Sequence, residues 1–258
     1  MNIYFKHYCG AITQYDYLFF ECMAEVPLEE EEEALNKGWL PDDYFRPKEG
    51  DKSHWYQARQ TRIDLSKFKE TRRTRKARKK CNLIIEKVFD ANIVDLEVLT
   101  EIFDKYTKYR NFKSWDLKPL INLEIDRKKF IVYHEQKNDS SWHKPIAFSF
   151  IRDVGNNSIF STQFAWDYEN PKLYLGKYAN LAEIDYCIDQ KKDYMYLGFG
   201  YEKSCIYKAD YEGFEFWTGE EWSDDIEHYK WLCERDSKIE KTSDLDKIKR
   251  YDDKYFFK

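Results

Sequence analysis

Residues 158–201 read SIFSTQFAWDYENPKLYLGKYANLAEIDYCIDQKKDYMYLGFGY. The opening segment SIFSTQFAWDY is rich in β-branched and aromatic side chains and predicts a strand. In residues 173–192, leucine, isoleucine and tyrosine recur every three to four positions, which predicts a helix. The segment DYMYLGFGY at 193–201 predicts another strand. The stretch is therefore expected to form a strand, a crossing helix and a second strand.

The preceding sequence extends this pattern. Residues 95–110, DLEVLTEIFDKYTKYR, carry apolar side chains at helical spacing, and residues 129–135 and 144–154 predict two strands. The order helix, strand, strand, strand, helix, strand is that of the GNAT type of acyltransferase fold. We therefore expect an α+β protein, with a GNAT-like mixed sheet within residues 85–258 and a charged C-terminal tail from Glu220 that is helical or loosely packed.

Residues 1–84 are expected to form a smaller N-terminal α/β subdomain that includes a basic segment. The first 26 residues predict two short strands with a turn near Gly10. Acidic residues after Pro27 favour a helix start, and Lys37-Gly38 favours its end. Residues 55–65 predict one strand, and residues 66–89 predict an extended entry followed by a helix.

Composition narrows the class of protein. Of 258 residues, 42% are hydrophobic and 18% aromatic, so a real core can form and general disorder is excluded. No run approaches the length of a membrane span, and the first residues lack a signal-peptide pattern. The six cysteines stand apart without a C-x-x-C pair, which argues against a zinc site or a disulfide framework. We expect a cytoplasmic protein without metal or cofactor.

The net charge of −5 conceals a basic segment. Between Lys52 and Lys80, twelve Lys and Arg residues stand against Asp64 and Glu70, a local charge of +10. On a helix, the basic side chains of TRRTRKARKK would surround the axis, so they cannot all pair internally. Because the arginine fork grips two phosphate oxygens, we predict that this segment binds a phosphate backbone. A solvated basic helix is the alternative.

A coenzyme A site is not evident. Ordinary GNAT acetyltransferases hold pyrophosphate on a Gly-rich turn at a helix N-terminus. The nearest match, RDVGNN at 152–157, leads into a predicted strand, and the start of the predicted helix at 173–192 has one glycine. The sequence thus disfavours acetyl-CoA and favours an acyl donor esterified to a nucleic acid.

Five blocks, in order, resemble the aminoacyl-tRNA–protein transferases, especially the arginyl and bacterial leucyl branch. The blocks are ALNKGW at 34–39, YFRP at 44–47, and the segments 57–80, 152–184 and 196–213. The chain departs from the arginyl enzymes because it lacks their cysteine pairs, and because Thr162-Gln163 replaces a Val-Tyr pair in the expected pocket strand. These departures bear on the donor amino acid and the acceptor rather than on the reaction type.

The resemblance implies transfer of an amino acid, of the Arg or Leu class, from its tRNA ester to an amine, typically the N-terminal α-amine of an acidic-ended protein. The ester is already activated, so the enzyme must align the reactants, accept one proton and stabilise an oxyanion. No strong nucleophile is needed. The expected partners are aminoacyl-tRNA and an acceptor protein or peptide, with no membrane.

Candidate residues follow from this reaction. Asp153 or Asp167 is expected to accept the proton, and Lys208 to contact the tRNA 3′ end or the oxyanion; a turn cap and a surface lysine are the alternatives. Tyr178 and Glu183 are expected at the substrate, against a surface salt bridge for Glu183. The acceptor arm is expected to lie on Arg72, Arg73, Arg75, Lys76, Arg78, Lys79 and Lys80. The terminal adenine is expected to stack on Tyr196, Tyr201 or Tyr207, against plain core packing.

Three other functions stay open at this point. The altered pocket strand also fits a tRNA-dependent ligase that acts on a peptide precursor or a small molecule. A CoA-dependent GNAT N-acetyltransferase and a catalytically idle RNA-binding module are the others. The sequence names neither the donor amino acid, nor the acceptor, nor the oligomeric state.

Overall fold

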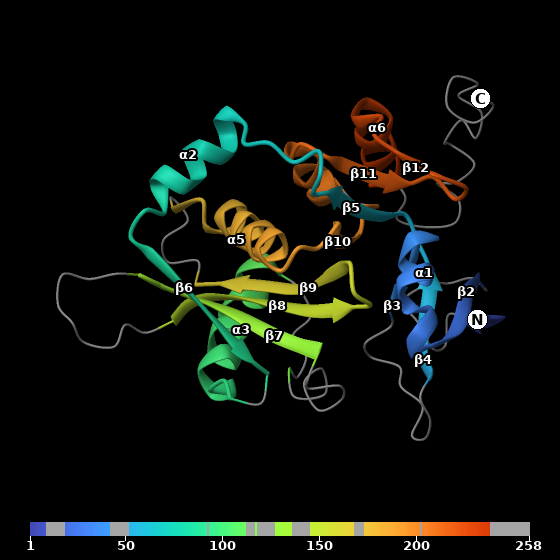
Figure 1. The fold of residues 1–258 in the computed structure, drawn as a ribbon, viewed down its shortest axis with the longest axis horizontal. Coiled ribbons are helices and arrows are strands. Elements are labelled where there is room, and N and C mark those ends of the chain that lie inside the picture. Colours follow the sequence, from blue (N-terminus) through green and yellow to red (C-terminus); the bar gives the residue numbers. More distant parts are fainter. Residues whose placement is uncertain are drawn as a thin grey trace. The chain divides into compact units, whose positions relative to one another are not determined.

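The computed structural model describes residues 1–8, 19–41, 52–91, 93–111, 117, 127–135, 145–167, 173–201 and 203–237 (Figure 1). The chain forms two compact units: unit 1 contains residues 1–62, 198–210 and 214–258, and unit 2 contains residues 63–197 and 211–213. The predicted boundary after residue 84 does not coincide with this division, because residues 63–84 share a core with the second half of the chain. The predicted turn near Gly10, the YFRP block and the chain beyond residue 237 lie outside the described residues.

Unit 1 contains a four-stranded antiparallel sheet in the order β1-β2-β4-β3. Trp55 of β4 is fully buried and anchors the core of this sheet. The predicted pair of N-terminal strands is confirmed, as is the acidic helix that ends before Gly38. The elements are β1 (Asn2–Tyr8), β2 (Phe19–Pro27), η1 (Leu28–Glu30), α1 (Glu31–Asn36), β3 (Trp39–Pro41) and β4 (Lys52–Gln57).

The C-terminal part of unit 1 forms a second cluster of elements. Phe214 and Phe216 pack against Tyr229, whose ring is fully buried. Asp225 accepts a hydrogen bond from the backbone N–H of His228 and caps the last helix. The tail from Glu220 was expected to be helical or loosely packed, and its described part contains a defined helix. The elements are η4 (Lys203–Asp210), β11 (Phe214–Trp217), β12 (Trp222–Ser223) and α6 (Ile226–Asp236).

Unit 2 is built on a mixed sheet. Strands β6 (Ile84–Asp90), β7 (Lys128–Glu135), β8 (Pro145–Val154) and β9 (Ser158–Trp166) are antiparallel neighbours in this order. Strand β10 (Tyr194–Phe199) pairs parallel to β9 over Tyr194–Tyr196, and α5 (Leu175–Asp189) connects the two. Parallel neighbours need such a crossover. The predicted GNAT-like mixed sheet, with its order of helices and strands, is therefore confirmed.

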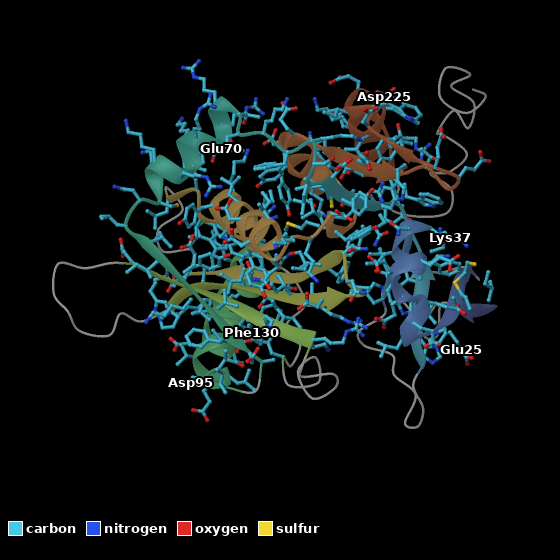
Figure 2. All side chains as sticks on the ribbon, viewed as in Figure 1. Glu25, Lys37, Glu70, Asp95, Phe130 and Asp225 are labelled. Atoms are coloured by element: carbon cyan, nitrogen blue, oxygen red, sulfur yellow. The ribbon has the colours of Figure 1, made fainter. Side chains whose placement is uncertain are left out.

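Two helices cover opposite faces of this sheet (Figure 1). Helix α3 (Leu96–Arg110) lies on the face that carries Phe130, Phe148 and Phe150, and the rings of Phe130 and Phe150 stack with centroids 4.7 Å apart (Phe130 is labelled in Figure 2). Helix α5 lies on the face that carries Tyr133 and Ile151. This division follows from strand geometry, since successive side chains point to opposite faces.

A β-bulge interrupts strand β9 at Thr162. Ile151 of β8 pairs with Ser161, whereas Phe150 pairs with Gln163, so Thr162 is an extra residue. Before the bulge, the α5 face carries Ile159 and then Ser161; after it, Ala165 joins the α3-facing core. The bulge thus reverses which residues of β9 face α5, and bulges of this kind are over-represented next to active sites.

Two predicted elements differ from the structure. Residues 66–89 were expected to end in a helix, but α2 (Arg72–Lys80) stops at Cys81 and residues 84–90 form the strand β6. Pairing with β7 decides this, because most side chains of β6 are exposed and give no apolar pattern. Residues 55–65 form parts of two strands, β4 and β5 (Gln60–Asp64), that are separated by Ala58 and Arg59.

Gly213 closes a tight turn in unit 2 and gives a stability prediction. Its φ is +80°, and an added Cβ would collide with the Asp64 carbonyl oxygen. Gly213→Ala is expected to destabilise unit 2 by roughly 3 kcal/mol, from left-handed strain plus the backbone clash, as measured by urea unfolding. Gly198→Ala is the control, since Gly198 has φ +76° and open space around it. Equal losses in both variants would show that the clash contributes nothing.

Candidate functional site

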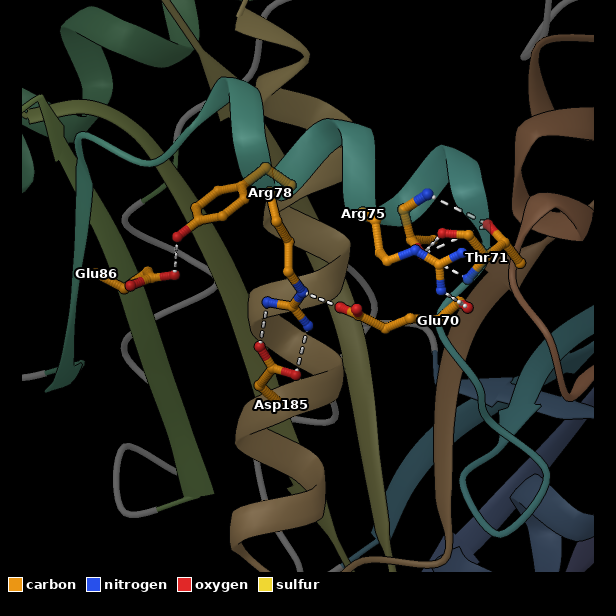
Figure 3. Close-up of polar contacts among 8 residues, drawn as sticks. Glu70, Thr71, Arg75, Arg78, Glu86 and Asp185 are labelled. Carbon is orange, nitrogen blue, oxygen red and sulfur yellow. Dashed lines mark hydrogen bonds and ion pairs between the residues drawn. The ribbon is translucent and has the colours of Figure 1, made fainter.

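The basic run forms a helix with a defined start. Thr71 caps α2 in a reciprocal box, in which its side chain accepts from the Thr74 N–H and the Thr74 hydroxyl accepts from the Thr71 N–H (Figure 3). Thr74, Ala77 and Cys81 are buried at helical spacing, so they seat α2 in unit 2. The basic residues outside this stripe are exposed: Arg72, Arg73, Arg75, Lys76, Lys79 and Lys80.

Arg78 differs from the other basic residues of α2. Its guanidinium donates two hydrogen bonds to the Asp185 carboxylate of α5, at 2.6 and 2.7 Å, and also pairs with Glu70 (Figure 3). The hydrogen bonds to Asp185 raise the pKa of Arg78 above its ordinary value. Arg78 was expected to bind tRNA, but in the structure its bidentate ion pair with Asp185 links α2 to α5.

This distinction predicts different behaviour for two adjacent residues. Arg78→Ala is expected to lower the free energy of unfolding by about 1 kcal/mol, because it removes a half-exposed ion pair, and to leave the salt dependence of tRNA binding unchanged. Lys79→Ala, at the exposed neighbour, is expected to keep stability and to reduce the salt slope by about one. Urea unfolding and tRNA titrations at several salt concentrations measure both. A smaller slope in Arg78→Ala would contradict the assignment.

Tyr174 adds an exposed ring beside the basic helix. Its side chain is 46% exposed, and the Lys76 ammonium lies 5.4 Å from the ring centroid. Its φ is +59°, which is unusual for a bulky residue, and it precedes the first residue of α5. An aromatic ring beside cations suits an unpaired nucleotide. The sequence offered no signal for this role beyond the nearby basic run.

Asp153 and Asp167 lie at opposite ends of the β8–β9 hairpin. Asp153 pairs with Ile159 next to the turn, and its carboxylate is 3.0 Å from the Lys192 ammonium. Asp167 follows the far end of β9, with a carboxylate oxygen 3.5 Å from the Lys105 ammonium. Asp167 lies eight residue steps beyond Ile159, which places the two aspartates about 25 Å apart. They cannot both act at one reacting centre.

Helix α5 carries Tyr178 and Glu183, the two other candidates of unit 2. The Tyr178 hydroxyl donates to a Glu86 carboxylate oxygen at 2.6 Å, and burial raises the pKa of this phenol. Glu183 faces the sheet and is 0% exposed, so the surface salt bridge considered from the sequence is wrong. Asp185 and Glu183 are two residues apart and point to different faces of the helix, as helical geometry requires.

Glu183 lies in a group of polar residues that we call the Glu183 cluster, of which four are buried and Ser161 is partly exposed: Glu183, Asn180, Tyr133, Ser149 and Ser161. Burial raises the pKa of the Glu183 carboxyl from 4.5 to about 7, although Ser149 and Ser161 favour its ionised form. Neither serine reaches the carboxylate oxygens with hydrogen-bond geometry. Ser149 does not donate to the carboxylate because its hydroxyl proton is used elsewhere. Tyr133 donates to the Ala179 carbonyl, so the Ser149 hydroxyl donates to the Tyr133 oxygen.

The remaining candidates lie on either side of the division between the units. Tyr196 belongs to unit 2 and is 0% exposed, so its ring offers no face to a base and core packing accounts for it. In unit 1, Tyr201 and Tyr207 are exposed, and Phe199 stacks on Tyr201 with centroids 6.2 Å apart. Lys208, expected at the tRNA 3′ end or the oxyanion, is buried and donates to the Phe199 carbonyl oxygen at 2.6 Å, so the alternative of a surface lysine is wrong.

Of the exposed rings of unit 1, the stacked pair Phe199 and Tyr201 forms an aromatic surface, and Tyr207 is a further exposed ring. Arg59 supports it, because its backbone N–H donates to the Tyr201 hydroxyl at 2.7 Å and its guanidinium lies 5.0 Å from the ring centroid. Asp236 holds that guanidinium at 2.8 Å. The sequence named Tyr201 and Tyr207 but missed Phe199 and Arg59, since their contacts join distant segments.

Residues 99–218, from α3 to the end of β11, match the family model described as "Arginine-tRNA-protein transferase, C terminus". This segment is therefore similar to the C-terminal part of those transferases. The matched segment includes β7–β10 and α5, and hence the whole Glu183 cluster. No curated protein matches by sequence.

Solved structures give more distant similarities. L-PGS from Bacillus licheniformis aligns with a TM-score of 0.46 and 11% identity over 69% of this chain and 54% of that one. FemX aligns with a TM-score of 0.47 and 9% identity over 69% of this chain and 63% of that one. The chain thus spans between half and two thirds of the length of these proteins. The fold assignment rests on the strand order and the crossover described above.

Two features are absent from the part of the chain that the structure describes. Over the described ranges, no helix is long and apolar enough to cross a membrane. Within the same residues, no group of three His, Cys, Asp or Glu side chains is arranged to hold a metal ion.

Proposed function

We propose that this protein transfers an amino acid of the Arg or Leu class from aminoacyl-tRNA to an amine, in particular the N-terminal α-amine of an acceptor protein. The match of residues 99–218 to the arginine-tRNA-protein transferase family carries the proposal. The chemistry is undemanding, because the ester is activated and an α-amine with a pKa near 8 is partly neutral at pH 7. Alignment, one proton acceptor and oxyanion stabilisation suffice.

The exposed side of α2 is the proposed contact for the tRNA acceptor arm. Its cations stand on one rigid, capped helix: Arg72, Arg73, Arg75, Lys76, Lys79 and Lys80. Two observations support the proposal. These side chains project from a helix seated by a buried stripe, and Tyr174 offers a ring beside them. Charge and stacking together are the usual means of holding a tRNA end.

The roles of the other candidates are proposed in a form that fits their placement. Either Asp153 or Asp167 accepts the proton from the amine. Each of these carboxylates forms an ion pair with a lysine. Lys208 supports the Phe199 backbone, so that Phe199, Tyr201 and Tyr207 keep their exposed arrangement for the terminal adenine. Tyr178 and Glu183 contact the aminoacyl end from α5.

A transfer assay with a full set of labelled aminoacyl-tRNAs tests the function. The acceptor is a protein with an acidic N-terminus, and its N-acetylated form is the control. We expect label from an arginyl or leucyl donor on the free N-terminus only. Label on a small molecule or peptide but not on the protein would indicate a ligase. Acetyl transfer from acetyl-CoA, or tRNA binding without turnover, would refute the proposal.

A further inference from the structure

Glu183 is a buried carboxyl without a counter-charge. The side chain is 0% exposed, and both of its oxygens lack a hydrogen-bond partner. None of the ion pairs among the described residues includes it. An isolated buried carboxylate is strongly unfavourable, so the group either holds a proton or awaits a cation. Unpaired buried groups of this kind concentrate where a ligand completes the set.

The residues around Glu183 are polar, and they also indicate a binding site. Asn180 lies one turn earlier on α5, on the same face of the helix, and its buried amide nitrogen also lacks a partner. Ser149 and Ser161 bring hydroxyl oxygens from β8 and β9. The Thr162 hydroxyl, at the bulge, is a further buried group without a partner. The residues around Glu183 therefore offer more hydrogen-bond donors and acceptors than contacts within the protein satisfy.

Solvent approaches this cluster along β9. Ser161 lies on the α5 side of the sheet and is partly exposed, whereas Ile159 before it is fully buried. The parallel pairing of β9 with β10 ends at Phe160 and Tyr196, although both strands continue. The bulge begins directly after Ser161. Of the five residues of the cluster, Ser161 is therefore the one that solvent reaches.

We propose that the Glu183 cluster is a recognition site for a protonated nitrogen group, an ammonium or a guanidinium, of one of the reactants. The cation occupies the site against the Glu183 carboxylate, with the serine oxygens completing its shell. This inference rests on the proposed function, in which every reactant carries such a group. Two sources fit the chemistry: the α-ammonium of an aminoacyl or acceptor end, and the guanidinium of an arginyl donor.

Binding of a cation at this site is expected to release protons, which can be measured. Near neutral pH a fraction of Glu183 is protonated, since burial raises its pKa to about 7. Binding a cation requires the carboxylate, so the protonated fraction releases its proton to solvent as the cation enters. Tyr133 of β7 and Cys187 of α5 are titratable groups that interact with Glu183, and burial raises the pKa of both, so they stay neutral. On α2, the charge next to α5 is Arg78, which Asp185 holds.

Calorimetry on the full chain tests the inference. The probes are L-leucinamide, which carries the α-ammonium alone, ethylguanidinium, which carries the guanidinium alone, and L-argininamide, which carries both. Titrations at pH 6.5 in buffers of different ionisation enthalpy count the protons released. Wild type is expected to release protons on binding. Glu183→Gln is expected to bind at least tenfold more weakly with no release, and Glu212→Gln, at an exposed carboxyl of unit 2, to match wild type.

The outcomes separate the sources and the hypotheses. Binding of leucinamide assigns the α-ammonium, and binding of ethylguanidinium assigns the donor side chain. No binding of any probe to wild type, or equal binding by a folded Glu183→Gln variant, would overturn the inference. Glu183→Gln is the same size and neutral, so a normal unfolding transition shows that it folds. If probes bind through Glu183 but no aminoacyl-tRNA donates its label, the proposed function fails and this site stands.

Discussion

Replacing Arg72, Lys79 and Lys80 with alanine is expected to weaken tRNA binding about a hundredfold near 0.1 M salt. All three side chains are exposed on α2. Each cation that neutralises a phosphate releases a counterion, so the slope of log affinity against log salt should fall in magnitude by between 2 and 3, roughly 0.9 for each phosphate that is no longer neutralised. Alanine is the best helix former, and the buried stripe of Thr74 and Ala77 stays in place.

The matched control removes the same charge elsewhere. Lys108→Ala, Lys191→Asn and Lys203→Ala change three exposed lysines outside α2, and asparagine tolerates the left-handed backbone at position 191. This variant is expected to keep most of the affinity and the wild-type slope. Fluorescence anisotropy with labelled tRNA, from about 50 to 200 mM salt, measures both. Equal losses in the two triple variants would mean that net charge, and not the surface of α2, binds the tRNA.

The sequence was sufficient for the order of the elements from α3 to β10, because each carries its own pattern of side chains. Helix α5 repeats apolar residues every three to four positions, and β7 to β9 are rich in β-branched and aromatic side chains. Strand β6 was missed because its exposed side chains carry no pattern, and pairing with β7 defines it. The bulge at Thr162 was also out of reach, since it exists only in the register between β8 and β9.

The candidate site was predicted less well, for one physical reason. A charged residue in a sequence is assigned to the surface unless its ion-pair or hydrogen-bond partner is known, and such partners come from distant segments. Arg78 was predicted as a tRNA contact without its partner Asp185. Lys208 was predicted at the tRNA 3′ end or the oxyanion without its hydrogen bond to the Phe199 carbonyl. For Glu183 a signal did exist. It follows Ala179 by four positions and precedes Cys187 by four, which places it on the sheet-facing side of α5.

Glu183→Gln is expected to make the protein more stable than wild type above about pH 8, by about 3 kcal/mol. In the folded chain, burial raises the pKa of the carboxyl from 4.5 to about 7. The folded state therefore holds this proton more tightly than the unfolded state, so wild-type stability falls as pH rises from about 4.5 through 7. The difference between the two pKa values corresponds to about 3 kcal/mol, and a neutral amide avoids that cost.

Urea unfolding of both proteins between about pH 4.5 and 8.5 measures this difference. At the acidic end both side chains are neutral, so the two free energies of unfolding should nearly coincide; they should diverge through pH 7. The nearby groups Tyr133, Tyr178 and Cys187 do not interfere, because burial raises the pKa of each. Glu212→Gln, at an exposed carboxyl, should follow wild type throughout. A difference that stays constant with pH would mean that Glu183 ionises as readily in the folded unit as in the unfolded chain.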